Sequence, residues 1–192
     1  MTRSTSSIAF LHGLSALLLS TILLPGGLHG GPVDQQRISP DTVAILRKDF
    51  AMSEVITLVQ NSPTRSSSRR YLQEQQRFNF IGTQRQEPMV LDGYSAGHLK
   101  SPIIGYSLFY YGTDGPLTIA DASVNPMNAA AKERLEDLLR KSLDSASNPD
   151  GSVLHFLGIY DLDSKRTLKI MIRKAQTPLG PDFAIRYAVS HR

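Results

Sequence analysis

Two apolar, aromatic-rich runs dominate the hydrophobic pattern of the chain, Ile103–Tyr111 and Ser152–Tyr160. Both runs are apolar at odd and at even positions, so neither shows the alternation of a strand with one face in water. Alternation is lost when a strand is covered on both faces. We therefore predict that these two runs are strands near the middle of a sheet.

Shorter runs predict further strands around these two. The turn Gly112–Gly115 separates Ile103–Tyr111 from Leu117–Ala122. A glycine-bearing turn between two apolar runs predicts a β-hairpin. The other candidate strands are Phe78–Ile81, Pro88–Leu91, Thr167–Arg173 and Phe183–Ser190.

Two segments have the periodicity of amphipathic helices. The first begins at Pro40, with Ser39 or Asp41 as its N-cap, and continues to Asn61. The second is Met127–Ser142, preceded by Asn125 as N-cap and Pro126 in the first turn. The apolar positions of the first are Val43, Leu46, Phe50, Val55, Leu58 and Val59, and those of the second are Leu135, Leu138, Leu139 and Leu143.

The order of these elements indicates the fold class. Strands, then a helix, then three more strands are typical of an α+β protein and not of βαβ alternation. We predict an antiparallel sheet of about five to seven strands with two main helices packed on it. The segment Asn61–Arg70 between the first helix and the first strand has no apolar periodicity, and we predict a loop there.

The N-terminal residues are typical of a secretory signal peptide. Met1–Ser7 carries Arg3 and no acidic residue, Ile8–Leu24 is an almost continuous apolar run, and prolines and glycines follow. We predict a signal peptide over residues 1–30, a polar linker over 31–39 and a single α+β domain over 40–192. The protein would then be secreted or periplasmic. If the segment is not cleaved, it would serve as a membrane anchor, because the run is close to the roughly 17 residues that can span a bilayer.

Composition narrows the chemistry. The 192 residues carry a formal net charge of +4 and contain no cysteine. The absence of cysteine excludes disulfides, thiolate metal sites and a cysteine nucleophile. Five arginines (Arg65, Arg69, Arg70, Arg77 and Arg85) form a basic segment, interrupted by Glu74. This segment is compatible with an anionic partner, but the net charge is too low to indicate nucleic acid.

One short motif is typical of hydrolases. Gly93–Gly97 matches the G-x-S-x-G pattern, in which a strained turn between a strand and a helix exposes a nucleophilic serine, here Ser95. Candidate bases are His98, His155 and His191, and candidate acids are Asp114 and Asp121. However, Pro102 and Gly105 do not suit the helix that should follow. We therefore favour a polar turn between two strands, with Ser95, His98 and His155 as weak catalytic candidates.

Strand parity predicts a basic patch. In Thr167–Arg173 and Phe183–Ser190, the apolar residues share one face, which leaves Lys169, Arg173 and Arg186 on the other. Pairing Ile170 with Ile185 would place Lys169 opposite Arg186 and Arg173 near Asp182.

The strand that contains His155 has two registers open to it. In one, His155 joins Lys169, Arg173 and Arg186 on the second face, and these residues would bind a carboxylate, phosphate or sulfate. In the other register, which we favour, His155 points into the core.

We expect a small exported binding protein that engages a ligand, an envelope component or a partner protein through its sheet face. The first alternative is a serine hydrolase that uses Ser95, and a second is a purely structural or toxin-like interaction module. No phosphate-binding loop, dinucleotide motif or zinc-binding spacing occurs in the sequence, so we expect neither a cofactor nor a metal.

Asp161–Ser164 resembles the start of a calcium loop but lacks its glycine and glutamate, and we expect a hairpin turn there. Contact with a membrane is expected only through an uncleaved N-terminal segment.

The signal-peptide interpretation predicts a mature N-terminus at or near Gly31 when the chain is produced in an exporting cell. Intact-mass measurement of the purified protein checks this. Recovery of the chain in the membrane pellet with Met1 retained would instead support the anchor.

Overall fold

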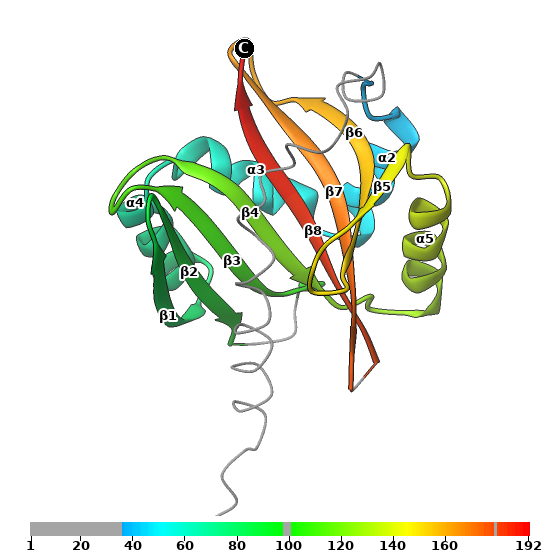
Figure 1. The fold of residues 1–192 in the computed structure, drawn as a ribbon, viewed down its shortest axis with the longest axis horizontal. Helices are drawn as coiled ribbons and strands as arrows, with labels where there is room; N and C mark the ends of the chain where they lie inside the picture. Colours follow the sequence, from blue (N-terminus) through cyan, green and yellow to red (C-terminus); the bar gives the residue numbers. More distant parts are fainter. Residues whose placement is uncertain (1–35, 98–100, 179) are drawn as a thin grey trace, which may run out of the picture.

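A computed structural model describes residues 36–97, 101–178 and 180–192. The predicted signal peptide and most of the predicted linker lie outside the described residues. Within them, eight strands form one antiparallel sheet in the order β1-β2-β3-β4-β8-β7-β6-β5 (Figure 1). The strands are β1 Phe78–Gln86, β2 Met89–Ala96, β3 Ile103–Tyr111, β4 Leu117–Val124, β5 Asp144–Ser147, β6 Val153–Asp161, β7 Arg166–Thr177 and β8 Gly180–His191. The predicted α+β class and the hairpin of β3 and β4 are confirmed, with more strands than expected.

The helices of the described residues pack mainly on one face of this sheet. They are α2 Pro40–Asp49, α3 Met52–Asn61, α4 Arg65–Arg70, the π-helical turn η2 Tyr71–Gln75 and α5 Ala129–Arg140. In Figure 1, α2 and α3 lie behind the sheet, α4 lies beside β1, and α5 lies beside β5. Among residues 36–97, 101–178 and 180–192, no helix has the length and apolar character needed to cross a membrane.

The first predicted helix is two helices. Ala51 adopts a left-handed conformation (φ 51°) and separates α2 from α3. The burial pattern explains the break. In a continuous helix, the next buried position after Leu46 and Phe50 would be residue 53 or 54. The buried residues are instead Met52 and Val55. A straight helix would turn Met52 away from the sheet. The break instead allows both segments to bury an apolar face.

The predicted loop at Asn61–Arg70 contains a helix that sequence periodicity does not reveal. Thr64 caps α4 reciprocally with Ser67, and α4 leads directly into η2. No apolar stripe exists in this helix, and its one fully buried residue, Ser68, donates a hydrogen bond to Ser62 O at 2.7 Å. Capping and side-chain hydrogen bonds therefore specify α4, in place of hydrophobic periodicity.

Strand register divides the sheet into two faces. On the helix-covered face, residues of β3, β8 and β7 such as Leu108, Ile185 and Ile170 belong to the main hydrophobic core. On the second face, one row of directly paired residues crosses the central strands: Ser107, Asp121, Arg186, Met171 and Phe156. Buried residues occupy β3 on both faces, as predicted for a central strand. The other apolar run, β6, is not central, because only β5 lies outside it.

The end of the predicted linker is part of the fold. The Ile38 N–H donates to Ile159 O at 3.0 Å, and the Ile159 N–H donates to Gln36 O at 2.9 Å. At the neighbouring bulge, Gly158 has φ +139°, and a Cβ there would lie 2.7 Å from the Ile38 backbone. Glycine is therefore required where the N-terminal segment crosses β6.

The predicted register of β7 and β8 is wrong by two residues. Ile172, and not Ile170, is opposite Ile185, so Met171 lies opposite Arg186 and Lys169 opposite Ala188. A shift of two keeps every side chain on its face, so the hydrophobic pattern cannot detect it. The turn between β7 and β8 sets the register instead, because the last pair of the β7–β8 ladder before the turn is Thr177 and Gly180.

Two further boundaries differ from prediction. Helix α5 starts at Ala129, because Asn128, and not Asn125, accepts the Ala131 N–H at 2.9 Å and caps it. The edge strand β5 was not predicted at all. Its sequence, DSAS, has low β-propensity, as is common in short strands at a sheet edge.

The predicted apolar stripe of α5 is buried, with Leu135 at 0% and Leu138 at 2% exposure. Leu138→Ala should therefore lower the free energy of unfolding by about 2–5 kcal/mol. Urea denaturation measures this, with exposed Glu136→Ala on the same helix as the control. Equal midpoints for the two variants would contradict the packing of α5.

Candidate functional site

The best-defined polar cluster is built around Asp92, a carboxylate of β2 with 0% exposure on the helix-covered face. Arg65, the first residue of α4, binds it in a bidentate manner. Its Nε lies 2.9 Å from Oδ2 and its Nη2 lies 2.8 Å from Oδ1. This geometry matches the planar guanidinium to both carboxylate oxygens, the strongest arrangement for such a pair.

A second ring of contacts holds this pair in place. Thr83 Oγ1 donates to Asp92 Oδ1 at 2.6 Å and accepts from Arg65 Nη2 at 2.8 Å. Arg69 lies one turn along α4, with Nη2 3.9 Å from Asp92 Oδ2 and its guanidinium carbon 3.9 Å from the centre of the Phe80 ring. Burial and the negative charge of Asp92 raise the pKa of Tyr94 to about 12, so Tyr94 stays a neutral donor at physiological pH.

A pocket of about 430 Å³ lies over this cluster. Three guanidinium groups contribute to its wall, together with two carboxylates and several hydrogen-bonding groups. The lining residues are Arg65, Ser66, Arg69, Arg70, Gln73, Glu74, Thr113 and Asp114. The volume lies in the range of small-molecule sites, roughly 300–1,000 Å³.

The turn between β3 and β4 forms the other side of the pocket. Asp114 accepts hydrogen bonds from Ser66 N at 2.7 Å and Ser66 Oγ at 3.1 Å. Arg65 Nη1 donates to Thr113 O at 3.2 Å. These contacts fix the turn to the start of α4. Asp114 is therefore engaged with α4, and the structure does not bring it to Ser95 as the acid of a catalytic triad.

Ser95 does not lie on a nucleophile elbow. It is inside β2, paired with Asn79 on one side and Gly105 on the other. The turn to a helix that would expose the hydroxyl is absent at this position, and our expectation of a turn here is also wrong, because strand β2 extends to Ala96. His98 lies outside the described residues. His155 is on β6, five strands away from β2 in the sheet order.

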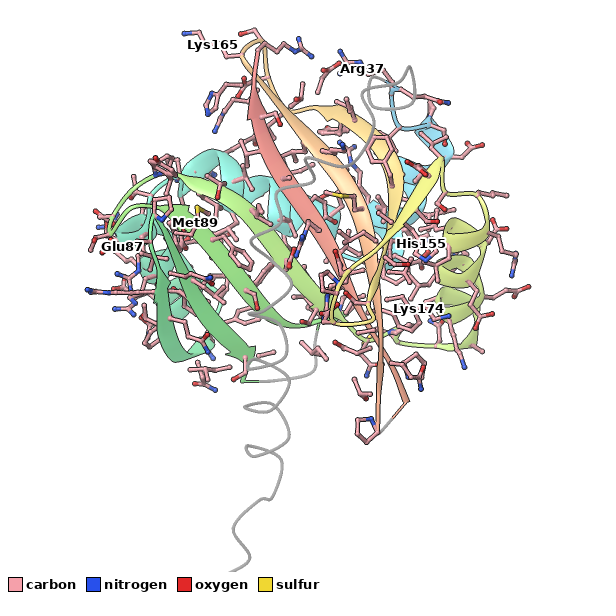
Figure 2. All side chains as sticks on the ribbon, viewed as in Figure 1. Arg37, Glu87, Met89, His155, Lys165 and Lys174 are labelled. Atoms are coloured by element: carbon pink, nitrogen blue, oxygen red, sulfur yellow. The ribbon has the colours of Figure 1, made fainter. Side chains whose placement is uncertain are left out.

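His155 pairs with the core residue Ile172, which places it on the helix-covered side of β6. In Figure 2 it is labelled beside α5. His155 is therefore not in the register that would place it with Lys169 and Arg186. Its Nδ1 lies 3.3 Å from Ser142 Oγ, just after α5. Partial burial, together with the nearby charge of Lys174, lowers the pKa of His155. The imidazole is therefore mainly neutral at physiological pH.

The other predicted ligand-binding residues share the second face as expected, but carboxylates accompany them. Arg186 Nε and Nη2 donate to the two oxygens of Asp121 at 2.8 and 2.7 Å, and both side chains are buried. Arg173 Nη2 donates to Asp182 Oδ2 at 3.2 Å. Arg173 is therefore near Asp182, as predicted, although its direct partner in the ladder is Ala184. Lys169 lies 4.9 Å from the centre of the Phe156 ring. A ligand-binding role for Lys169, Arg173 and Arg186 stays a prediction.

The remaining candidate chemistry is structural. Asp163 accepts hydrogen bonds from the Lys165 and Arg166 N–H groups at 2.9 and 2.8 Å, so the segment that resembles a calcium loop is a hairpin turn. Within the described part of the chain, no group of three or more histidine, aspartate or glutamate side chains could hold a metal ion.

Sequence reasoning did not single out Asp92 as the centre of a site. The arginine segment was recognised, and Arg65, Arg69 and Arg70 do gather at one pocket. Arg85 and Arg77 do not line it. The one available signal was an aspartate in a run that otherwise reads as a strand, because a buried carboxylate needs a cationic partner.

Removing the charge of Asp92 should lower the stability of the fold. Asp92→Asn leaves Arg65 without its counter-ion, so unfolding should become easier by about 3 kcal/mol, the low end for a broken buried pair because Arg65 retains some access to water. Thermal or urea denaturation measures this. Asp137→Asn, which removes an exposed pair on α5, is the matched control and should change stability little. A similar effect in both variants would show that the Asp92 cluster does not anchor α4.

No family model matches the chain, and no curated protein or solved structure matches it either. The function is therefore inferred from the chemistry of the site.

Proposed function

We propose that the protein is an exported binding protein for an anionic ligand, and that Arg65, Arg69 and Arg70 form the recognition surface. The observation that carries this proposal is the buried Asp92 carboxylate, which holds Arg65 in a fixed orientation at the pocket wall. An arginine that is fixed before binding loses little side-chain entropy when a ligand arrives. The site thus moves from the sheet face, where we expected it, to the pocket between α4 and the β3–β4 turn.

The charges around the pocket narrow the ligand class. Asp92 is buried beneath the pocket and balances the charge of Arg65, whereas Glu74 and Asp114 line the pocket directly. A ligand with an anionic group and several hydroxyls satisfies both kinds of side chain. Its carboxylate or phosphate would bind the guanidinium groups, and its hydroxyls would donate to the carboxylates. An acidic saccharide of a cell-envelope polymer has this chemistry.

Arg70 is the best residue for a test, because it is exposed and lines the pocket. Arg70→Gln should weaken the binding of D-glucuronate about tenfold, the loss of one charge-assisted hydrogen bond. Titrations followed by NMR chemical shifts measure this, and the affinity should fall with added salt. Arg85→Gln is the control, an exposed arginine of β1 that does not line the pocket.

Equal weakening in both variants would indicate general charge attraction and would contradict the site. Glucose, which lacks the anionic group, should bind more weakly than glucuronate. Equal binding of the two sugars would also count against the proposal.

The alternative function is a serine hydrolase that uses Ser95. The position of Ser95 within β2 lends it no support. Covalent labelling by a fluorophosphonate, lost in Ser95→Ala, would establish this alternative.

A further inference from the structure

A second pocket, of about 160 Å³, lies between α3, η2 and the ends of β1, β2 and β3. Its one titratable wall residue is Glu54 of α3, and Gln76, Phe78 and Ser101 also line it. Ser101 Oγ donates to the Glu54 carboxylate, with distances of 3.3 Å to Oε2 and 3.5 Å to Oε1. The same Ser101 oxygen accepts the Ile103 N–H at 3.2 Å. These contacts hold the carboxylate at the pocket.

Glu54 differs from the other partly buried or buried carboxylates discussed above, because no cationic side chain of the described residues pairs with it. Asp92 has Arg65, Asp121 has Arg186 and Asp182 has Arg173. Among residues 36–97, 101–178 and 180–192, no lysine, arginine or histidine lies within ion-pair distance of Glu54. Burial raises the pKa of Glu54, and the hydrogen bond from Ser101 lowers it only in part. Among the described residues, the Glu54 carboxylate therefore has the Ser101 hydroxyl and the N-terminal end of α3 beside it, and no cationic side chain.

The other walls suit an organic cation. Phe78 lines the pocket and packs on Tyr106, with ring centres 5.1 Å apart, so its ring is fixed. An aromatic ring beside a carboxylate attracts an ammonium group through its negative face. Gln76 Nε2 donates to Tyr71 Oη at 3.2 Å, which orients its amide. The amide oxygen of Gln76 adds a hydrogen-bond acceptor.

The same features argue against a metal ion or an anion. One carboxylate with a hydroxyl and an amide does not provide the six to eight oxygens that calcium takes, or the several carboxylates of most divalent sites. An anion would meet the charge of Glu54 without a cation to offset it. A primary ammonium requires only one carboxylate and two or three acceptors, and its alkyl chain can contact Phe78, Ala96 and Ile103.

We infer that the pocket at Glu54 binds a primary ammonium group carried on an unbranched alkyl chain, with Glu54 as counter-ion and Phe78 as the apolar wall. The ammonium can come from a free alkylamine or from a lysine side chain. This site is separate from the arginine pocket and does not depend on the function proposed for it.

The experiment uses n-butylammonium as the probe and follows the backbone and methyl NMR signals of Ala96 and Ile103 in the full chain. n-Butylammonium should shift these signals in a saturable way, whereas the neutral analogue 1-butanol should bind at least about tenfold more weakly. Glu54→Gln should weaken the ammonium about tenfold and leave 1-butanol unchanged. Exposed Glu133→Gln on α5 is the control and should change neither.

The pH dependence supplies an independent readout. Because the folded pKa of Glu54 lies above its usual value, the affinity for n-butylammonium should begin to fall at a higher pH than an exposed glutamate would allow. The stability of the ligand-free fold changes with pH in the opposite direction. Ionising Glu54 without a ligand destabilises the fold as the pH rises through the folded pKa, so Glu54→Gln should match the wild type at low pH and exceed its stability at neutral pH.

Equal binding of n-butylammonium and 1-butanol, or an unchanged affinity in Glu54→Gln, overturns the inference. Nα-acetyl-lysine methylamide distinguishes the sources. Tighter binding than n-butylammonium indicates a lysine side chain, and weaker binding indicates a free amine.

Discussion

The N-terminal half of the structure depends on the neutralisation of one buried carboxylate. Taking Asp92 out of water costs several kcal/mol unless a cation and further donors replace its hydration. Arg65 provides both nitrogens of a bidentate pair and Thr83 provides the third short hydrogen bond. Since α4 begins at Arg65, the position of this helix follows from the position of Asp92. The position of α4 in turn fixes the β3–β4 loop, because this loop is hydrogen-bonded to Arg65 and Ser66.

A similar arrangement occurs in the centre of the sheet. Asp121 and Arg186 form a bidentate pair across β4 and β8 on the second face, with exposures of 1% and 7%. The two strands belong to distant parts of the sequence, and their junction joins the two halves of the sheet. Pairing at this junction has no turn to set its register. A buried ion pair provides that specificity, because a shifted register would leave both charges uncompensated.

Side-chain chemistry explains which parts of the fold the sequence could reveal. The long strands carry β-branched and aromatic residues, so β3, β6, β7 and β8 were recognised, and parity placed Lys169, Arg173 and Arg186 on one face correctly. The features that the sequence did not predict depend on contacts between residues that are distant in the chain. The register of β7 and β8 is set by a turn, and α4 is set by capping and by a partner 27 residues away in the sequence. The five-arginine segment was visible as a charge pattern, but only the fold shows that Arg65, Arg69 and Arg70 line the pocket whereas Arg77 and Arg85 do not.

The two pockets have opposite charge character although they share one strand. Asp92 underlies the arginine pocket and Ala96 lines the Glu54 pocket, on the same face of β2. Four residues of strand separate them by roughly 13 Å. Tyr94 lies between these positions with 0% exposure, and its ring packs against Phe80 at 5.6 Å. The buried ring of Tyr94, packed on Phe80, separates the two carboxylates, so a different set of neighbours surrounds each one. Arg65 balances the charge of Asp92 within the protein, whereas the described partner of Glu54 is the Ser101 hydroxyl, and the proposed ammonium ligand would supply the charge that Arg65 supplies to Asp92.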